Sequence, residues 1–216
     1  MPPMQIAIVL YDQFTALDAI GPYEVLSRLD GAEVVFTAER PGPVRTDTGM
    51  VAVTAGAALG DVPHPDIVLV PGGPGSEAQL RDGPLREWLR AADAASTWTT
   101  SVCTGSLILA AAGLLAGRRA TSHWLALGRL DALGAQATAE RVVIDGKYVT
   151  AAGVSAGIDM ALDLSARIAG APAAQAIQLM IEYDPQPPFS AGSPGTAPPD
   201  LVARLRQGSR HLAWAG

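Results

Sequence analysis

Short runs of consecutive apolar residues recur along the chain and constrain its fold more than any other feature. Gln5–Tyr11 and Asp66–Val70 have the length of strands but no polar alternation, which is typical of parallel strands buried on both faces. Ala32–Ala38 reads as another strand, and helix-like segments such as Pro84–Ala95 and Ser155–Ile168 follow such strands. This order predicts an α/β fold with a doubly wound, mostly parallel sheet and helices on both faces.

Other segments complete this outline. Hairpins are expected at Val44–Thr54 and at Val142–Thr150, where Asp145-Gly146 is a typical turn pair. Ala16–Gly21 is predicted to be a loop or short turn, because Pro22 suits the first position of a helix. The remaining predicted helices are Pro22–Leu29, Trp124–Leu133, Pro172–Tyr183 and Asp200–Leu212.

Length and composition predict one domain over residues 1–216, with a Pro-rich surface segment at 184–199 and a C-terminal helix at 200–212. The Pro-rich segment is expected to wrap the body or to cover a site. A net charge of −6 without a basic cluster argues against nucleic acid as a partner. No apolar stretch is long enough to span a membrane. A single cysteine and no recognisable leader predict a cytoplasmic protein.

The single cysteine, Cys103, lies where a nucleophile would lie. A β-prone segment leads into it, Thr104 and Gly105 follow, and an apolar helix-forming run comes next. This pattern predicts a strand, a sharp turn and a helix, the geometry of a nucleophile elbow. The start of the helix should favour the thiolate through its partial positive charge. The alternative is a small buried apolar residue, as most free cysteines are.

Three features fall at predicted strand ends and should therefore meet at the carboxyl edge of the sheet. They are the loop with Asp18, the Gly72-Gly73 pair and Cys103. The glycines could aim backbone N–H groups at a developing negative charge, or form a plain turn between strand and helix. Asp18 could lie half-buried near a site, or cap the helix expected at Pro22.

Other polar residues are weaker candidates. The Thr104 hydroxyl could bind substrate or cap the helix of the elbow. His123 could act as a base for the cysteine, or cap the helix predicted near Trp124. Asp184 could cap or turn the chain in its Pro-rich segment. Three scattered histidines and one cysteine lack the spacing of zinc ligands, so no metal site is expected.

The order of these motifs resembles the ThiJ/PfpI superfamily, with its class I glutamine-amidotransferase-like, flavodoxin-like fold. Within that superfamily the isonitrile hydratases are most similar. Thr104 stands where the protease-like branch has histidine, and Asp18 stands where the glyoxalase-like and deglycase branches have glutamate. The resemblance covers nearly the whole chain and rests on Phe14, Leu17–Pro22, Glu24-Val25, Val70–Gly73, Ser101–Gly105, Thr121–Trp124, Gly153–Asp159 and Glu182–Phe189.

The resemblance implies that the protein adds water to an isonitrile, R–NC, to give an N-substituted formamide without a cofactor. Cys103 would attack the terminal carbon, Asp18 would act as general acid and base, and Thr104 would hold the nitrogen or the water. Asp184 would lie near the substrate pocket, and His123 would lie behind the reacting groups. A homodimer is also implied.

Two alternatives stay open. One is another cysteine-dependent enzyme of the same superfamily, such as a glyoxalase, deglycase or amidase. The other is a redox or ligand sensor without catalytic activity, in which the thiol is oxidised. Related sensor domains belong to transcription regulators, which need a further helix-turn-helix region that the residues after Pro199 are too few to supply.

Overall fold

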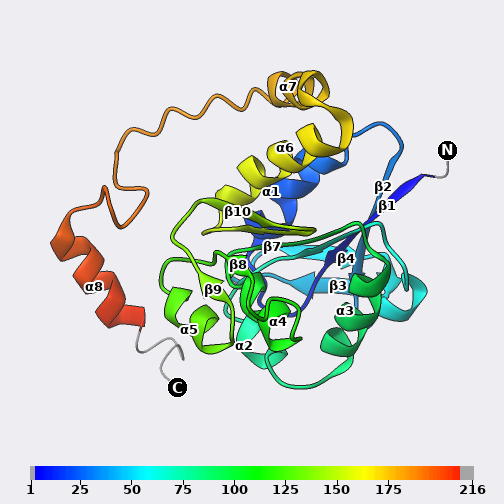
Figure 1. The fold of residues 1–216 in the computed structure, drawn as a ribbon, viewed down its shortest axis with the longest axis horizontal. Helices are drawn as coiled ribbons and strands as arrows, with labels where there is room; N and C mark the ends of the chain where they lie inside the picture. Colours follow the sequence, from blue (N-terminus) through cyan, green and yellow to red (C-terminus); the bar gives the residue numbers. More distant parts are fainter. Residues whose placement is uncertain (1–2, 210–216) are drawn as a thin grey trace.

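A seven-stranded sheet forms the centre of the computed structural model, which describes residues 3–209 (Figure 1). Its strands lie in the order β10-β11-β7-β6-β1-β2-β5, and only the β10–β11 pair is antiparallel. The predicted doubly wound, mostly parallel sheet is therefore confirmed. The strands are β1 (Met4–Val9), β2 (Ala32–Ala38), β5 (Ala57–Ala58), β6 (Ile67–Val70), β7 (Trp98–Val102), β10 (Val142–Asp145) and β11 (Tyr148–Ala151).

Helices cover both faces of this sheet. Figure 1 shows α1, α6 and α7 on one side and α2, α3 and α4 on the other. Short strand pairs β3–β4 and β8–β9 lie outside the central sheet. Their bounds and those of the helices are α1 (Ala16–Leu26), β3 (Gly42–Arg45), β4 (Ala52–Ala55), η1 (Leu59–Asp61), α2 (Ser76–Gln79), α3 (Pro84–Ala95), α4 (Gly105–Ala111), β8 (Arg119–Ala120), α5 (Leu127–Ala132), β9 (Gln136–Ala137), α6 (Ala156–Ala169), α7 (Ala171–Met180) and α8 (Pro199–Ser209).

The buried side chains of the innermost strands form the centre of the hydrophobic core. All four residues of β6 are buried, and so are Ile6–Val9 of β1, because helices pack on both faces of these strands. Removing these aliphatic side chains from water is the main favourable term in forming the sheet. It also explains why strands without polar alternation could be recognised from the sequence.

The topology brings together the loops that contain the predicted site residues. β1 and β6 are neighbours, but the chain passes from β1 to β2 on one side and from β6 to β7 on the other, so the connections leave this pair in opposite directions. Ligands in open α/β sheets bind at such a switch point, at the carboxyl ends of the strands. Asp18 follows β1, Gly72 follows β6 and Cys103 follows β7, which places all three at this edge.

The start of α1 differs from the sequence prediction. Residues Ala16–Gly21 are helical rather than a loop, and Pro22 lies inside α1 instead of at its first position. A proline inside a helix costs about 3 kcal/mol, because it removes a backbone N–H and crowds the preceding turn. Packing offsets this cost: Pro22 is buried against α6, where a Cβ added to Gly157 would lie 3.0 Å from the proline Cγ.

Three further predicted helices have different bounds. α7 ends at Met180 rather than at Tyr183. α5 begins at Leu127 rather than at Trp124, because a turn comes first, in which the Ala126 N–H donates to the His123 carbonyl oxygen over 2.7 Å. α8 spans Pro199–Ser209, and residues 210–212 of the predicted C-terminal helix lie outside the described residues. Within the described residues, no helix has the length and apolar character that crossing a membrane requires.

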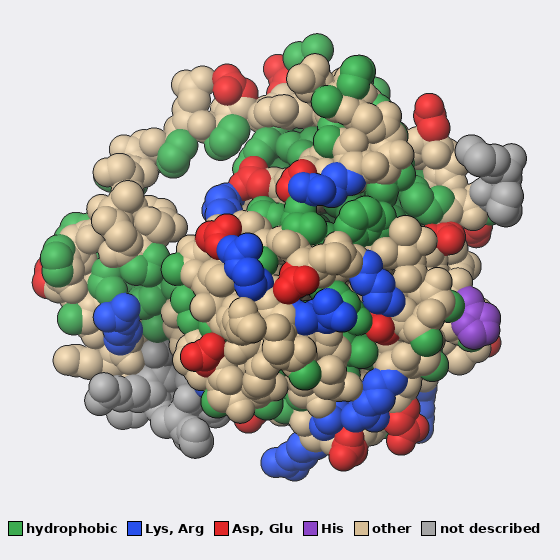
Figure 2. Space-filling view, in the orientation of Figure 1, with side chains coloured by type: hydrophobic (Ala, Val, Ile, Leu, Met, Phe, Trp, Pro, Cys, Tyr) green, Lys and Arg blue, Asp and Glu red, His purple; other side chains and the backbone are tan. Residues whose placement is uncertain are grey.

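The Pro-rich segment at 184–199 is largely exposed. It runs outside the body from α7 to α8 (Figure 1), and Figure 2 shows open space between part of it and the body. Its residues 192–195 nevertheless line a cavity together with residues of the body, so part of the segment covers a hollow of the molecule.

Candidate active site

Cys103 lies at a sharp turn between β7 and α4, so the predicted elbow is confirmed. Its backbone has a φ of 57°, a left-handed conformation that non-glycine residues rarely adopt. The turn needs a glycine two residues later, because a Cβ at Gly105 would lie 2.1 Å from the Val70 carbonyl oxygen. This close packing of α4 on β6 holds the cysteine at the carboxyl edge of the sheet.

Asp18 meets this cysteine from the first turn of α1. The carboxyl group is completely buried, and its Oδ2 accepts a hydrogen bond from the Gly72 N–H over 2.8 Å. Its other oxygen, Oδ1, has no nitrogen or oxygen donor among the described residues. The Cys103 thiol interacts with the same carboxyl group. Asp18 therefore faces the sulfur and does not cap a helix that begins at Pro22.

Burial controls the protonation of both groups. It raises the pKa of Asp18 from 3.8 to about 7, although the Gly72 N–H and the thiol oppose the shift. Burial and the negative charge of Asp18 also raise the pKa of Cys103 well above its ordinary value. The N–H groups of Thr104 and Val154 and the Thr104 hydroxyl lower this pKa but do not compensate. The expectation that the elbow favours the thiolate is therefore wrong, because desolvation outweighs the helix start.

Cys103 is 6% exposed, so a small molecule has only a narrow approach to the sulfur. Cys103 and Asp18 together hold one proton at a pH above the pKa of Asp18 and two protons at a pH below it. Two interacting groups of this kind titrate as a pair, and the proton they retain can be held by either partner. The thiol and the carboxylate can thus act together, with the sulfur as the nucleophile and the carboxylate as the acceptor of its proton.

The Thr104 hydroxyl is held by the loop that follows β6. Its Oγ1 accepts a hydrogen bond from the Gly73 N–H over 2.9 Å and from the Ser76 hydroxyl over 3.1 Å. Thr104 occupies the N-cap position of α4, but its side chain makes no capping hydrogen bond. The capping interpretation is therefore wrong, and the hydroxyl lies beside the reactive sulfur.

The two glycines after β6 position side chains. The Gly72 N–H is bound to Asp18 and the Gly73 N–H to Thr104, so neither is free to receive an oxyanion as the sequence suggested. Close approach does require glycine at both positions: a Cβ at Gly72 would lie 2.4 Å from the Thr104 nitrogen, and one at Gly73 would lie 2.5 Å from the Gln13 carbonyl oxygen.

His123 lies next to the site rather than in it. Its Nδ1 accepts a hydrogen bond from the Leu125 N–H over 3.3 Å, and burial lowers the pKa of the ring. The ring lines a cavity of about 700 Å³ together with Gly153 and Val154. Because the Val154 N–H is directed at the Cys103 sulfur, this cavity borders the site.

Asp184 is exposed, and its carboxyl group accepts a hydrogen bond from the Gln186 side-chain amide over 3.2 Å. It does not line this cavity and makes no hydrogen bond to Cys103, Asp18 or Thr104 within residues 3–209. The structure therefore does not bring Asp184 together with the other predicted site residues.

Sequence reasoning missed three residues that support the site. Tyr11 donates from its hydroxyl to the Pro71 carbonyl oxygen over 2.7 Å, and the charges of Asp18 and Cys103 raise its pKa in addition to burial. Ser76 binds Thr104, and Ser122 donates to the Cys103 carbonyl oxygen over 3.0 Å. The position of Tyr11 at the end of the first strand was the available signal. Residues 3–209 contain no group of His, Cys, Asp or Glu that could hold a metal ion.

The fold and the elbow define a doubly wound α/β protein with a buried cysteine–carboxyl pair. The chain belongs to the DJ-1/PfpI family, which residues 4–167 match. It is 42% identical over 204 residues to an isonitrile hydratase from Pseudomonas putida, a match covering 94% of this chain and 89% of the relative. The crystal structure of a ThiJ/PfpI family protein from Pseudomonas syringae superimposes with a TM-score of 0.94 at 38% identity, covering 98% of this chain and 88% of that chain.

A regulator is also among the relatives. The chain is 38% identical over 131 residues to the HTH-type transcriptional regulator CdhR from Pseudomonas aeruginosa. That match covers 60% of this chain but only 38% of the regulator. The isonitrile hydratase shares far more of its length with this chain than the regulator does.

Proposed function

We propose that this protein is an isonitrile hydratase that adds water to R–NC through a Cys103 thioimidate, with Asp18 as general acid and base. The observation that carries the proposal is a completely buried Asp18 carboxyl group that the Gly72 N–H holds by a hydrogen bond, that interacts electrostatically with the Cys103 thiol, and whose pKa burial raises to about 7. Such a carboxyl group can both take and give a proton near neutral pH. The similarity to the Pseudomonas putida isonitrile hydratase supports the same reaction.

The first half of the reaction forms a covalent bond. The Cys103 sulfur attacks the terminal carbon of the isonitrile while the thiol proton passes to Asp18. Asp18 then delivers this proton to the same carbon, which gives the thioimidate R–N=CH–S–Cys103. Proton transfer is needed because the high pKa of the thiol leaves little free thiolate, and the carbanion that forms must be protonated.

The second half adds water. Asp18, again a carboxylate, takes a proton from the water that attacks the thioimidate carbon and passes it to the nitrogen, which gives R–NH–CH(OH)–S–Cys103. The C–S bond then breaks while the remaining hydroxyl proton passes through Asp18 to the sulfur, and the formamide R–NH–CHO leaves. The sum is one isonitrile and one water, without an oxidant or reductant. The Thr104 hydroxyl, fixed by Gly73 and Ser76, would hold the nitrogen or the water.

Exposed apolar side chains support the expectation of a homodimer. Leu179, Met180 and Phe189 are 78%, 69% and 80% exposed, and apolar surface of this kind commonly marks a contact between proteins. A homodimer, a cytoplasmic location and catalysis without a cofactor stay predictions.

The direct test is to incubate the full chain with cyclohexyl isocyanide and to measure N-cyclohexylformamide by mass spectrometry. Methylglyoxal, assayed in parallel, represents the alternative carbonyl chemistry. We expect formamide at a rate far above that of heat-denatured protein. Consumption of methylglyoxal without formamide would overturn the proposal in favour of a glyoxalase. No turnover of either, together with a readily oxidised Cys103, would overturn it in favour of a sensor.

The proposed mechanism also predicts a pH profile. Attack requires that the pair hold one proton, so the doubly protonated form below the pKa of Asp18 is inactive. We expect kcat/KM to rise about tenfold per pH unit up to about pH 7 and then to level off, as a single essential ionisation demands. Samples returned from pH 5 to pH 8 should regain full activity, which excludes irreversible denaturation. A rate that is flat or falls between pH 5 and pH 7 would contradict the shared-proton mechanism.

A further inference from the structure

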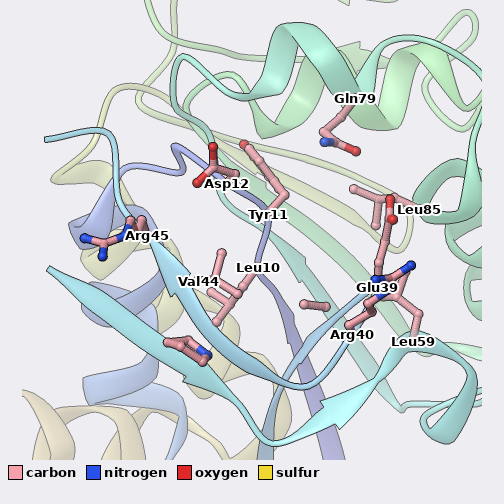
Figure 3. Close-up of a pocket in the computed structure, with 12 residues that line it drawn as sticks. Leu10, Tyr11, Asp12, Glu39, Arg40, Val44, Arg45, Leu59, Gln79 and Leu85 are labelled. Carbon is pink, nitrogen blue, oxygen red and sulfur yellow. The ribbon is translucent and has the colours of Figure 1, made fainter. Parts of the chain in front are cut away.

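A second cavity, of about 480 Å³, lies beyond the carboxyl ends of β1 and β2 (Figure 3). Cys103, Asp18 and Thr104 do not line it, so it is distinct from the candidate active site. Tyr11 contributes to both regions: it lines the cavity, and its hydroxyl binds Pro71 at the start of the loop that holds Asp18. The volume falls within the range of cavities that bind small molecules.

The floor of this cavity is apolar. Leu10, Leu59 and Leu85 are 2%, 5% and 3% exposed and come from the end of β1, from η1 and from α3. Figure 3 shows Leu10 and Val44 between the two ends of the labelled group. A ligand seated here would contact these side chains without any rearrangement of the core, and the more exposed Pro43 and Val44 of the lining would supply most of the apolar surface that it covers.

The rim carries acidic and basic groups side by side. Glu39 and Arg40 come from the loop after β2 and lie at one end of the cavity, whereas Asp12 and Arg45 lie at the other (Figure 3). Within residues 3–209, the side chains of Asp12, Glu39 and Arg40 take part in no hydrogen bond or ion pair, whereas Arg45 donates to the Gly49 carbonyl oxygen. The rim therefore offers charged groups that the protein itself leaves unused.

A ligand of one charge sign does not suit this rim. An anion at Arg40 would lie beside the Glu39 carboxyl group, and a cation at Glu39 would lie beside the guanidinium group. A head group that carries both charges pairs with both residues. An ion pair at a partly enclosed cavity is stronger than one on an open surface, because less water screens it.

We propose that this cavity binds an α-amino acid with an apolar side chain. Arg40 binds the carboxylate, which suits a guanidinium group because two parallel hydrogen bonds can form. Glu39 binds the ammonium group. The aliphatic side chain of the ligand lies on the apolar floor that Leu10, Leu59 and Leu85 form.

Titration calorimetry of the full chain with L-leucine tests this proposal. We expect saturable binding of one leucine per chain with a Kd of about 1 mM or lower. Two analogues separate the contributions of the head group: 4-methylpentanoate lacks the ammonium, and 3-methylbutylamine lacks the carboxylate. Each should bind at least about tenfold more weakly, because one charged group of the rim is then left without a partner. Equal binding of leucine and 4-methylpentanoate would overturn the proposal.

Arg40→Ala should weaken leucine binding about tenfold or more, and Glu39→Gln should weaken it in the same direction. Arg81→Ala is the matched control, because Arg81 is an exposed arginine that does not line the cavity. The affinity of this control variant for leucine should equal that of the wild type. An absence of saturable heat up to about 10 mM leucine, or an Arg40→Ala affinity equal to that of the wild type, would show that the cavity is not an amino-acid site.

Discussion

Cys103→Ala should lower the rate of formamide production from cyclohexyl isocyanide by at least about 10³-fold, because no other group can form the thioimidate. Cys103→Ser should be impaired to a similar degree, since a hydroxyl is a far weaker nucleophile than a thiol beside the same carboxylate. The measurement is single-turnover formation of N-cyclohexylformamide with protein in excess. Mass spectrometry of the quenched wild-type protein should reveal the added mass of the isonitrile on Cys103.

Ser106→Ala is a control from the same elbow. Ser106 lies in α4 and donates from its hydroxyl only to the Cys103 carbonyl oxygen, over 3.1 Å. This variant disturbs the elbow without touching the sulfur, so its rate should stay within about threefold of the wild type, the change expected when one peripheral hydrogen bond is lost. If Cys103→Ala retained a tenth or more of the wild-type rate, the covalent route would be excluded even though the protein hydrates isonitriles.

Asp18→Asn should abolish most of the activity and stabilise the protein at the same time. We expect a loss of about 10²–10⁴ in kcat, the usual contribution of a general acid–base group. The gain in stability arises because burial raises the pKa of Asp18 from 3.8 to about 7. Ionisation of this carboxyl group is therefore easier in the unfolded chain than in the folded one. The stability of the wild type should therefore fall as the pH rises from about 4 to about 7 and change little from this group above that.

The size of the stability gain follows from the shift in the pKa of Asp18. One pKa unit corresponds to about 1.4 kcal/mol, so at pH 8 the variant should be more stable by about 1–3 kcal/mol once the cost of burying an amide is allowed for. Urea unfolding at pH 5 and pH 8 measures the difference, which should be smaller at pH 5. Asp30→Asn, at an exposed position, is the matched control and should change stability little at either pH. If Asp18→Asn were less stable than the wild type at pH 8, the raised pKa would be wrong.

Much of the fold could be predicted because local signals and packing agree. β2 and α3 have the predicted bounds, and both hairpins lie where their turn residues indicate. The start of α1 was misplaced because Pro22 is a strong signal for a helix start, and the packing of α6 on its ring outweighs that signal. The sequence contains no local trace of a contact between two helices so far apart along the chain.

The members of the site were easier to predict than their chemistry. Cys103 and Asp18 could be expected to meet because strand ends in such a sheet share one edge, whereas Thr104 was chosen from the resemblance to the ThiJ/PfpI superfamily. The direction of the thiol pKa could not, because it depends on how completely the neighbouring side chains exclude water. The roles of Gly72 and Gly73 likewise depend on which oxygen atoms reach their N–H groups. The amino-acid cavity was not foreseen, since its rim is assembled from separate loops.

The loop after β6 holds the Asp18 carboxyl group and the Thr104 hydroxyl at once, through two consecutive peptide nitrogens. A one-residue insertion or deletion between Val70 and Ser76 would shift both anchors together, and no single compensating substitution elsewhere could restore them. This stretch should therefore vary in side chains but not in length when the protein is diversified by random mutagenesis. The length of this loop sets the spacing between the Asp18 carboxyl group, the Thr104 hydroxyl and the Cys103 sulfur.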